Sequence, residues 1–215
     1  MNRMNRAPAL RLALFGGSFD PIHRGHLHVA RAALEHFRFD QIHFLPALVP
    51  PHKREHSLLP VEDRLDLLCA ALRDEPRFLI EEDEIRRGGS SYTFDTLSRL
   101  RAAKPPGTRL FFLIGGDSLQ DLPKWHRAAD LVREFTLVTV PRDRQGPAED
   151  WLKPLRAAFP KEDVERLERH VLPVEPLPIS STEVRERVRR GLSIDALVPE
   201  GVAALIAARG YYFEG

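Results

Sequence analysis

The chain has 215 residues, of which 43% are hydrophobic and 29% are charged, and its formal net charge is only +1. This length and composition predict a folded body with a sizeable core, and they exclude an intrinsically disordered chain. They provide no bulk electrostatic attraction for nucleic acid, so any affinity for phosphate must come from a local site.

Residues 1–9 are predicted to form a short leader, and residues 10–215 to form one domain. The leader carries two arginines, but no apolar stretch with a small-residue cleavage site follows it, so it does not resemble a secretory signal. No apolar run approaches the roughly 20 residues that a helix needs to span a bilayer. We therefore expect a cytoplasmic protein that has no membrane partner.

The next stretch, residues 12–27, reads LALFGGSFDPIHRGHL and predicts a strand, a glycine turn and the start of a helix. Backbone amides at such a junction, with the positive end of the helix dipole behind them, suit an anion. His23 and His26 stand on either side of Gly25 and add hydrogen-bond donors. The alternative is an ordinary turn with surface histidines, but the two imidazoles favour the anion site.

Helical spacing of apolar residues continues to residue 37, and residues 41–45 then predict a second buried strand. Residues 46–60 are rich in proline and are expected to form a surface loop that contains PPHK. Loops beyond the carboxyl ends of parallel strands surround the ligand crevice, so Lys53 of this motif is predicted to face the histidines.

Three further elements are predicted before the middle of the chain. A helical stripe covers residues 61–72 and is expected to bury Cys69, the single cysteine, while residues 78–85 predict a strand with an acidic outer face. Thr93 is expected to cap a helix over residues 94–103, with Asp95 in its first turn. Residues 109–114 are the clearest buried strand, and they run into GGD.

The second half continues the alternation of strands and helices. It predicts a helix over residues 127–134, a strand over 135–140, helical character over 147–170 and a short strand over 171–174. A helix is expected to begin at ISSTEVR, and another over residues 199–209 to end at Gly210. This order predicts an α/β fold, a Rossmann-like, doubly wound, mostly parallel sheet flanked by helices.

Five motifs carry a resemblance to a known family: GGSFDPIHRGH, PPHK, SYTFDT, GGDSLQDLPKW and ISSTEVR. In this order, over residues 12–212, they resemble the bacterial nicotinate-nucleotide adenylyltransferases of the HxGH nucleotidyltransferase superfamily. The first and last motifs alone would identify only the superfamily, whereas SYTFDT and LPKW narrow the resemblance to pyridine-nucleotide synthesis. It implies adenylyl transfer from ATP to nicotinate mononucleotide, giving nicotinate adenine dinucleotide and pyrophosphate in NAD biosynthesis.

The resemblance implies a catalytic set of His23, His26, Lys53 and Arg185. The histidines would contact the ATP phosphates and the charge that develops at the α-phosphorus. Such a transfer needs mainly positioning and electrostatic stabilisation, so a direct in-line attack without a covalent enzyme intermediate is expected. For Lys53, the alternative to a role in phosphate binding is a solvated surface lysine. For ISSTEVR, the alternative is an N-cap on a surface helix.

The same resemblance implies a nucleotide site. In it Gly17 lets the backbone approach the ligand, Ser18 and Phe19 supply amides or a hydroxyl, and Asp117 accepts from ribose hydroxyls. Plain packing of Phe19 and a capping role for Asp117 remain open. The expected nucleotide-binding residues are Gly16, Gly17, Ser18, Phe19, His23, Gly25, His26, Gly115, Asp117, Ile179, Ser180, Ser181, Thr182 and Arg185.

For the acceptor, the resemblance implies that Trp125 stacks on the pyridine ring and that amides near Thr93 and His126 receive the nicotinate carboxylate. A core position is the alternative for Trp125. The chain departs from the family pattern at His126, where tyrosine is common, and at PRDR (residues 141–144), which leaves open whether Arg142 or Arg144 reaches a phosphate. The expected acceptor residues are Lys53, Ser91, Tyr92, Thr93, Asp95, Trp125, His126 and Arg142.

Mg²⁺ is the implied metal, held mainly by ATP phosphates and water, so no protein ligand is expected. The expected partners are the small molecules ATP and nicotinate mononucleotide, without nucleic acid, and a homo-oligomer is compatible with the sequence. One alternative is an adenylyltransferase of the same fold that acts on nicotinamide mononucleotide or phosphopantetheine. Another alternative is a nucleotide-binding or RNA-binding module that catalyses no reaction. The presence of all four expected catalytic residues argues against it.

Overall fold

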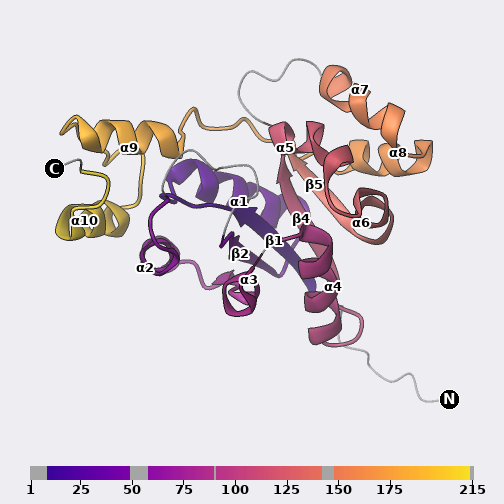
Figure 1. Ribbon diagram of the computed structural model, residues 1–215, viewed down its shortest axis with the longest axis horizontal. Coiled ribbons are helices and arrows are strands. Elements are labelled where there is room, and N and C mark those ends of the chain that lie inside the picture. The colour runs from indigo at the N-terminus through magenta and orange to yellow at the C-terminus, as the bar shows by residue number, and fades with distance from the viewer. Residues whose placement is uncertain (1–8, 49–57, 90, 142–147, 214–215) are drawn as a thin grey trace.

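The structure, a computed structural model, describes residues 9–48, 58–89, 91–141 and 148–213. One parallel sheet forms its centre, with the strand order β3-β2-β1-β4-β5 (Figure 1). This confirms the predicted doubly wound α/β fold. The strands are β1 (Arg11–Gly17), β2 (Gln41–Pro46), β3 (Phe78–Ile80), β4 (Arg109–Gly115) and β5 (Thr136–Val140).

Helices connect the strands and continue beyond β5. None of them, within the described residues, is long and apolar enough to cross a membrane. The helices are α1 (Arg24–His36), α2 (Val61–Leu72), α3 (Asp83–Arg87), α4 (Thr93–Ala103), α5 (Gly116–Gln120), the 3-10 turn η1 (Leu122–Lys124), α6 (Ala128–Glu134), α7 (Ala148–Ala158), α8 (Lys161–Arg169), α9 (Ser181–Arg189) and α10 (Glu200–Arg209).

The sheet buries both of its faces because successive side chains of a strand point to opposite sides. Along β1, Ala13 and Phe15 join the core cluster that contains residues of α1, α2, α9 and α10. Leu12 and Leu14 join the other cluster, with α4, α6, α7 and α8. The chain winds outward in both directions from β1, so the crevice beyond its carboxyl end is the expected place for a ligand.

Helix α2 buries residues 68 and 72 of its predicted apolar stripe, but the cysteine between them does not face the core. Cys69 is exposed, so its predicted core position is wrong. The helix instead buries Arg64 together with Leu67 and Leu68. Arg64 is drawn inward because its Nη1 donates to the carbonyls of Ser18, at 2.8 Å, and Ala47, at 2.9 Å.

The strand predicted over residues 78–85 ends at Ile80, and its acidic residues do not form an outer face. Glu81 and Glu84 are only 7% and 4% exposed. Glu81 has polar partners in its buried position: its Oε2 lies 3.5 Å from Nδ1 of His43 and 3.3 Å from Nζ of Lys104. The contact with His43 and the charge of Lys104 hold the pKa of Glu81 at about 2.

Two local predictions need smaller corrections. Thr93 is the first residue of α4 instead of its cap, and the N-cap is Tyr92, whose side chain makes no capping hydrogen bond within the described chain. The strand predicted over residues 171–174 is a single bridge between Thr139 and Val171, where that segment passes the end of β5. The first correction matters for function, because it leaves first-turn amides of α4 open to a ligand.

Candidate active site

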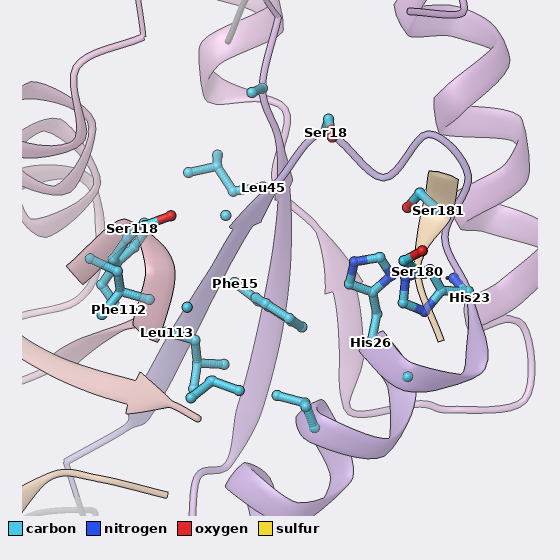
Figure 2. A pocket seen from close by; sticks show the side chains of 18 of the residues that line it. Phe15, Ser18, His23, His26, Leu45, Phe112, Leu113, Ser118, Ser180 and Ser181 are labelled. Atoms are coloured by element: carbon cyan, nitrogen blue, oxygen red, sulfur yellow. Dashed lines mark hydrogen bonds between the residues drawn. The ribbon is translucent and has the colours of Figure 1, made fainter. Parts of the chain in front are cut away.

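The carboxyl ends of β1, β2, β4 and β5 open into one pocket of about 830 Å³ (Figure 2). Its floor consists of residues 15–17 from β1 and Ser18 after it, Leu45 from β2, residues 112–115 from β4 and Val140 from β5. This is the crevice that the topology predicts, and its volume is typical of a small-molecule site.

Both histidines of the first motif line this pocket at the start of α1. Their rings stack, with centroids 3.7 Å apart and an interplanar angle of 26°. The backbone N–H of His23, the N-cap of α1, donates to Nδ1 of His26 at 3.3 Å. In neutral His26 the proton therefore resides on Nε2, which makes that atom a hydrogen-bond donor.

Two glycines make this packing sterically feasible. A Cβ on Gly25 would lie 3.0 Å from Nδ1 of His23, and one on Gly17 would lie 2.9 Å from the ring of Phe19. Phe19 packs its buried ring against Phe15 and His26. Its side chain therefore belongs to the core, and a contact of its backbone with nucleotide remains a prediction.

The start of α9 lies beside the histidines in the pocket, as Figure 2 shows for Ser181 and the N-cap Ser180. Ser180 caps the helix by accepting from the backbone N–H of Glu183 at 3.1 Å. Ser180 therefore both caps α9 and lines the pocket. All five residues that were predicted here line the pocket: Ile179, Ser180, Ser181, Thr182 and Arg185.

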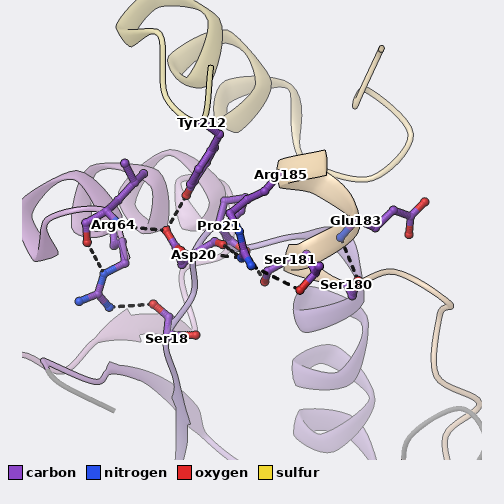
Figure 3. Close-up of polar contacts among 11 residues, drawn as sticks. Ser18, Asp20, Pro21, Arg64, Ser180, Ser181, Glu183, Arg185 and Tyr212 are labelled. Carbon is purple, nitrogen blue, oxygen red and sulfur yellow. Dashed lines mark hydrogen bonds and ion pairs between the residues drawn. The ribbon is translucent and has the colours of Figure 1, made fainter. Parts of the chain in front are cut away.

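Two hydrogen bonds fasten α9 to the loop between β1 and α1 (Figure 3). Nη1 of Arg185 donates to the backbone carbonyl of Asp20 at 2.7 Å, and Oγ of Ser181 donates to that of Pro21 at 2.9 Å. Segments more than 150 residues apart thereby form one wall of donors. Imidazole, hydroxyl and guanidinium groups together suit a polyphosphate.

Sequence reasoning missed the polar core behind this wall. The Asp20 carboxylate is buried, and its Oδ1 accepts from the hydroxyl of Tyr212 at 2.8 Å and from the backbone of Leu59 at 3.3 Å (Figure 3). Burial lowers the pKa of Arg64, and the charge of Asp20 opposes this shift. Burial and the contact with Asp20 raise the pKa of Tyr212. An arginine within an apolar helix face was the one signal in the sequence for this cluster.

The other end of the pocket is lined by the start of α4 and by the segment after η1. Ser91, Tyr92 and Thr93 line it from the first side, and Trp125 and His126 from the second. The rings of Tyr92 and His126 lie 4.5 Å apart between centroids. Trp125 is partly buried against the α4 side of the core, so it packs and lines the pocket at once.

The remaining predicted residues fall into two groups. Phe19, Asp95 and Asp117 are described but are not among the residues that line the pocket. Asp95 lies beside it, with Oδ1 3.8 Å from Nε2 of His126, and Ser118 lines it in place of exposed Asp117. Lys53, Arg142 and Arg144 lie outside the described residues. Besides Ser118, the charged residues of the pocket lining that sequence reasoning missed are Glu84, Lys124 and Glu183.

The histidine end of the pocket fits an anion better than a bare metal ion. In the described ranges, no group of three or more His, Cys, Asp or Glu side chains is arranged to hold a metal. The donors at this end fit phosphates that arrive with their own cation.

Comparisons with known proteins agree with this geometry. A family model described as cytidylyltransferase-like matches residues 14–187. A Dehalococcoides mccartyi protein named "Probable nicotinate-nucleotide adenylyltransferase" is 36% identical over 95% of this chain and 98% of its own. A protein of the same name from Geobacillus thermodenitrificans is 40% identical over 94% and 86%.

Solved structures show the same fold at low sequence identity. The Plasmodium falciparum nicotinic acid mononucleotide adenylyltransferase complexed with NaAD superposes with a TM-score of 0.75 at 18% identity, covering 94% of this chain and 97% of that chain. Its complex with APC gives a TM-score of 0.74 at the same identity and coverage.

Proposed function

Because the chain belongs to the nicotinate-nucleotide adenylyltransferases, within the cytidylyltransferase-like family, we propose how its pocket carries out their reaction. The enzyme transfers the adenylyl group of ATP to nicotinate mononucleotide, giving nicotinate adenine dinucleotide and pyrophosphate in NAD biosynthesis. One observation supports the residue assignment above all. The stacked histidines and the first turns of α9, which include Arg185, form a wall of hydrogen-bond donors at one end of the pocket. The start of α4, which has no side-chain cap, lies at the other end.

At the donor wall, a phosphate oxygen of nicotinate mononucleotide attacks the α-phosphorus of ATP. The new P–O bond forms as the bond from the α-phosphorus to the pyrophosphate oxygen breaks, so no covalent enzyme intermediate is needed. His23 and His26 donate to the α-phosphate, and Arg185 with the hydroxyls of α9 holds the departing pyrophosphate. Fixed donors stabilise this charge without reorganising during the reaction.

At the other end, the first-turn amides of α4 receive the acceptor carboxylate. Tyr92, the N-cap, leaves them without a side-chain cap, and the helix dipole favours a negative charge there. Trp125 stacks on the pyridine ring, and Tyr92 and His126 cover the entrance as a ring pair.

We propose that ATP binds as its Mg²⁺ complex; the ion would be held by phosphates and water and would supply positive charge for the leaving pyrophosphate. Lys53 is proposed as a mobile cation beside the same phosphates. We also propose a cytoplasmic location, a single domain over residues 10–215 and no nucleic-acid partner. The sequence is compatible with a homo-oligomer.

The test compares acceptors side by side. The purified chain is given ATP and Mg²⁺ with nicotinate mononucleotide, nicotinamide mononucleotide or phosphopantetheine, and pyrophosphate release is followed. The expected result is the highest kcat/KM with nicotinate mononucleotide. Equal or faster release with another acceptor would contradict this assignment, and no release with any of them would favour a binding module without turnover.

A further inference from the structure

Glu84 is a buried carboxyl group in the acceptor end of the pocket that the reaction above does not use. It lies in the short helix α3 and is 4% exposed, yet it lines the pocket together with Ser91 and Thr93. Carboxyl groups are seldom buried unless they are paired or neutral. Its position beside the proposed carboxylate site therefore needs a physical reason.

A series of hydrogen bonds between side chains connects Glu84 to α4. Oγ1 of Thr96, in α4, donates to Oε1 of Glu84 at 3.0 Å and accepts from Nη2 of Arg99 at 3.1 Å. The same Nη2 donates to Asp83 at 2.7 Å, which holds Arg99 in place. Because the Thr96 hydroxyl has one proton, Oε1 is committed as an acceptor. When Glu84 is neutral, its proton therefore resides on Oε2.

The surroundings of Glu84 favour its neutral form. Burial raises the pKa of its carboxyl, and the charge of Asp83 adds to this shift. The contacts with Ser91 and Thr96 and the charge of Arg87 oppose it. Among the described residues, Arg99 of α4 donates to the same Thr96 hydroxyl, and Lys124 and His126 line the same pocket. Asp95 lies beside His126, with Oδ1 3.8 Å from Nε2 of that ring.

We propose that Glu84 determines the choice between acidic and amide acceptors. Neutral Glu84 donates from Oε2 to the carboxylate of nicotinate mononucleotide, whereas ionised Glu84 repels that carboxylate and accepts from the carboxamide of nicotinamide mononucleotide. This rests on the proposed function, which places the pyridine substituent at the start of α4, one helical turn before Thr96. In a pocket of low polarity, the difference between repulsion and a hydrogen bond is large.

The KM values for the two acceptors should depend on pH in different directions. Binding of the acidic acceptor stabilises the proton on Glu84, so the KM for nicotinate mononucleotide must rise as pH rises through the pKa of this carboxyl. For nicotinamide mononucleotide the KM must fall or stay constant over the same range. The kcat values should change little, because Glu84 lies at the opposite end of the pocket from the donor wall.

The experiment measures kcat and KM for both acceptors between about pH 5 and about pH 8, around and above the ordinary range of a carboxyl group. In the wild-type enzyme the ratio of the two KM values should change by about tenfold, which corresponds to one pKa unit of coupling. Glu84→Gln keeps the side-chain shape and the acceptor for Thr96 but cannot ionise, so its ratio should be constant.

Two control variants test whether groups other than Glu84 cause the pH dependence of the KM ratio. Glu81→Gln removes a second buried acid of the same segment, which stays ionised over this range, and should leave the pH dependence of the ratio intact. His126→Gln changes the pocket itself, but a change of ratio with pH should persist in it.

Three results would overturn the proposal. A ratio that does not change with pH in the wild-type enzyme would do so even if Glu84→Gln failed to fold. A pH dependence that is unchanged in Glu84→Gln would do the same while leaving the proposed function intact. Absence of pyrophosphate release with either acceptor would overturn the proposed function and this inference together.

Discussion

Arg185 donates a hydrogen bond of 2.7 Å to the backbone carbonyl of Asp20, and this contact joins the two halves of the donor wall. The Asp20 carboxylate, on the other side of the same residue, accepts from Tyr212 near the C-terminus (Figure 3). Asp20 thus connects the first motif, the last motif and the end of the described chain. The geometry of the phosphate end should therefore depend on residues that touch no phosphate.

Replacing His26 with alanine should reduce kcat by about 10²- to 10³-fold, the usual effect of losing one preorganised donor to transition-state charge. Far-ultraviolet circular dichroism should show an intact fold, because His26 is only partly buried. Exposed His36, at the other end of the same helix, offers the control: His36→Ala should leave kcat unchanged. A His26→Ala enzyme of normal rate would remove this residue from the catalytic set.

Gly25→Ala should reduce kcat by about tenfold while the fold remains stable. The new Cβ would lie 3.0 Å from Nδ1 of His23, so the stacked imidazole must shift, and small misplacements of reacting groups are costly. Gly201→Ala in α10 is the matched control, since its Cβ would meet ordinary contacts at 3.4 Å and beyond. Steady-state kinetics and thermal unfolding of both variants test the prediction, which fails if Gly25→Ala keeps full activity.

Tyr212→Phe should destabilise the protein by about 1–3 kcal/mol, because the buried Asp20 carboxylate loses a hydrogen-bond donor. It should also raise the KM for ATP, since Asp20 positions Arg185. The neighbouring Tyr211 provides the comparison, as its hydroxyl donates to Asp63 on α2 at 2.6 Å. Tyr211→Phe should lose stability without a change in the KM for ATP, and equal kinetic effects in the two variants would contradict the connection.

Glu81 should make stability depend on pH in acid. Its pKa of about 2 lies below the ordinary value, so its contribution is complete above about pH 5 and is lost as pH falls toward 2. Glu81→Gln should therefore cost about 3 kcal/mol near pH 7 and much less near pH 3, measured by urea unfolding. Glu82→Gln, at the exposed neighbouring position, should cost little at either pH. A loss from Glu81→Gln that is equal at both pH values would refute this account.

Local sequence patterns are enough to predict most of the elements and the location of the pocket. A continuous apolar run in β1, helical spacing in α1 and glycines at strand ends are local signals, and they correctly predicted the parallel sheet and its helices. Because parallel strands end at one edge, separate motifs at those ends had to meet there. Most of the predicted site residues that the structure describes accordingly line one pocket.

The burial of particular polar groups, by contrast, depends on tertiary contacts that local patterns do not contain. Cys69 is exposed because distant carbonyls attract Arg64 of the same helix, and Glu81 and Glu84 are buried because partners from β2 and α4 receive them. Local periodicity fixes backbone conformation and marks apolar faces. The burial of a charged or polar side chain, however, depends on donors and acceptors that folding brings from far along the chain.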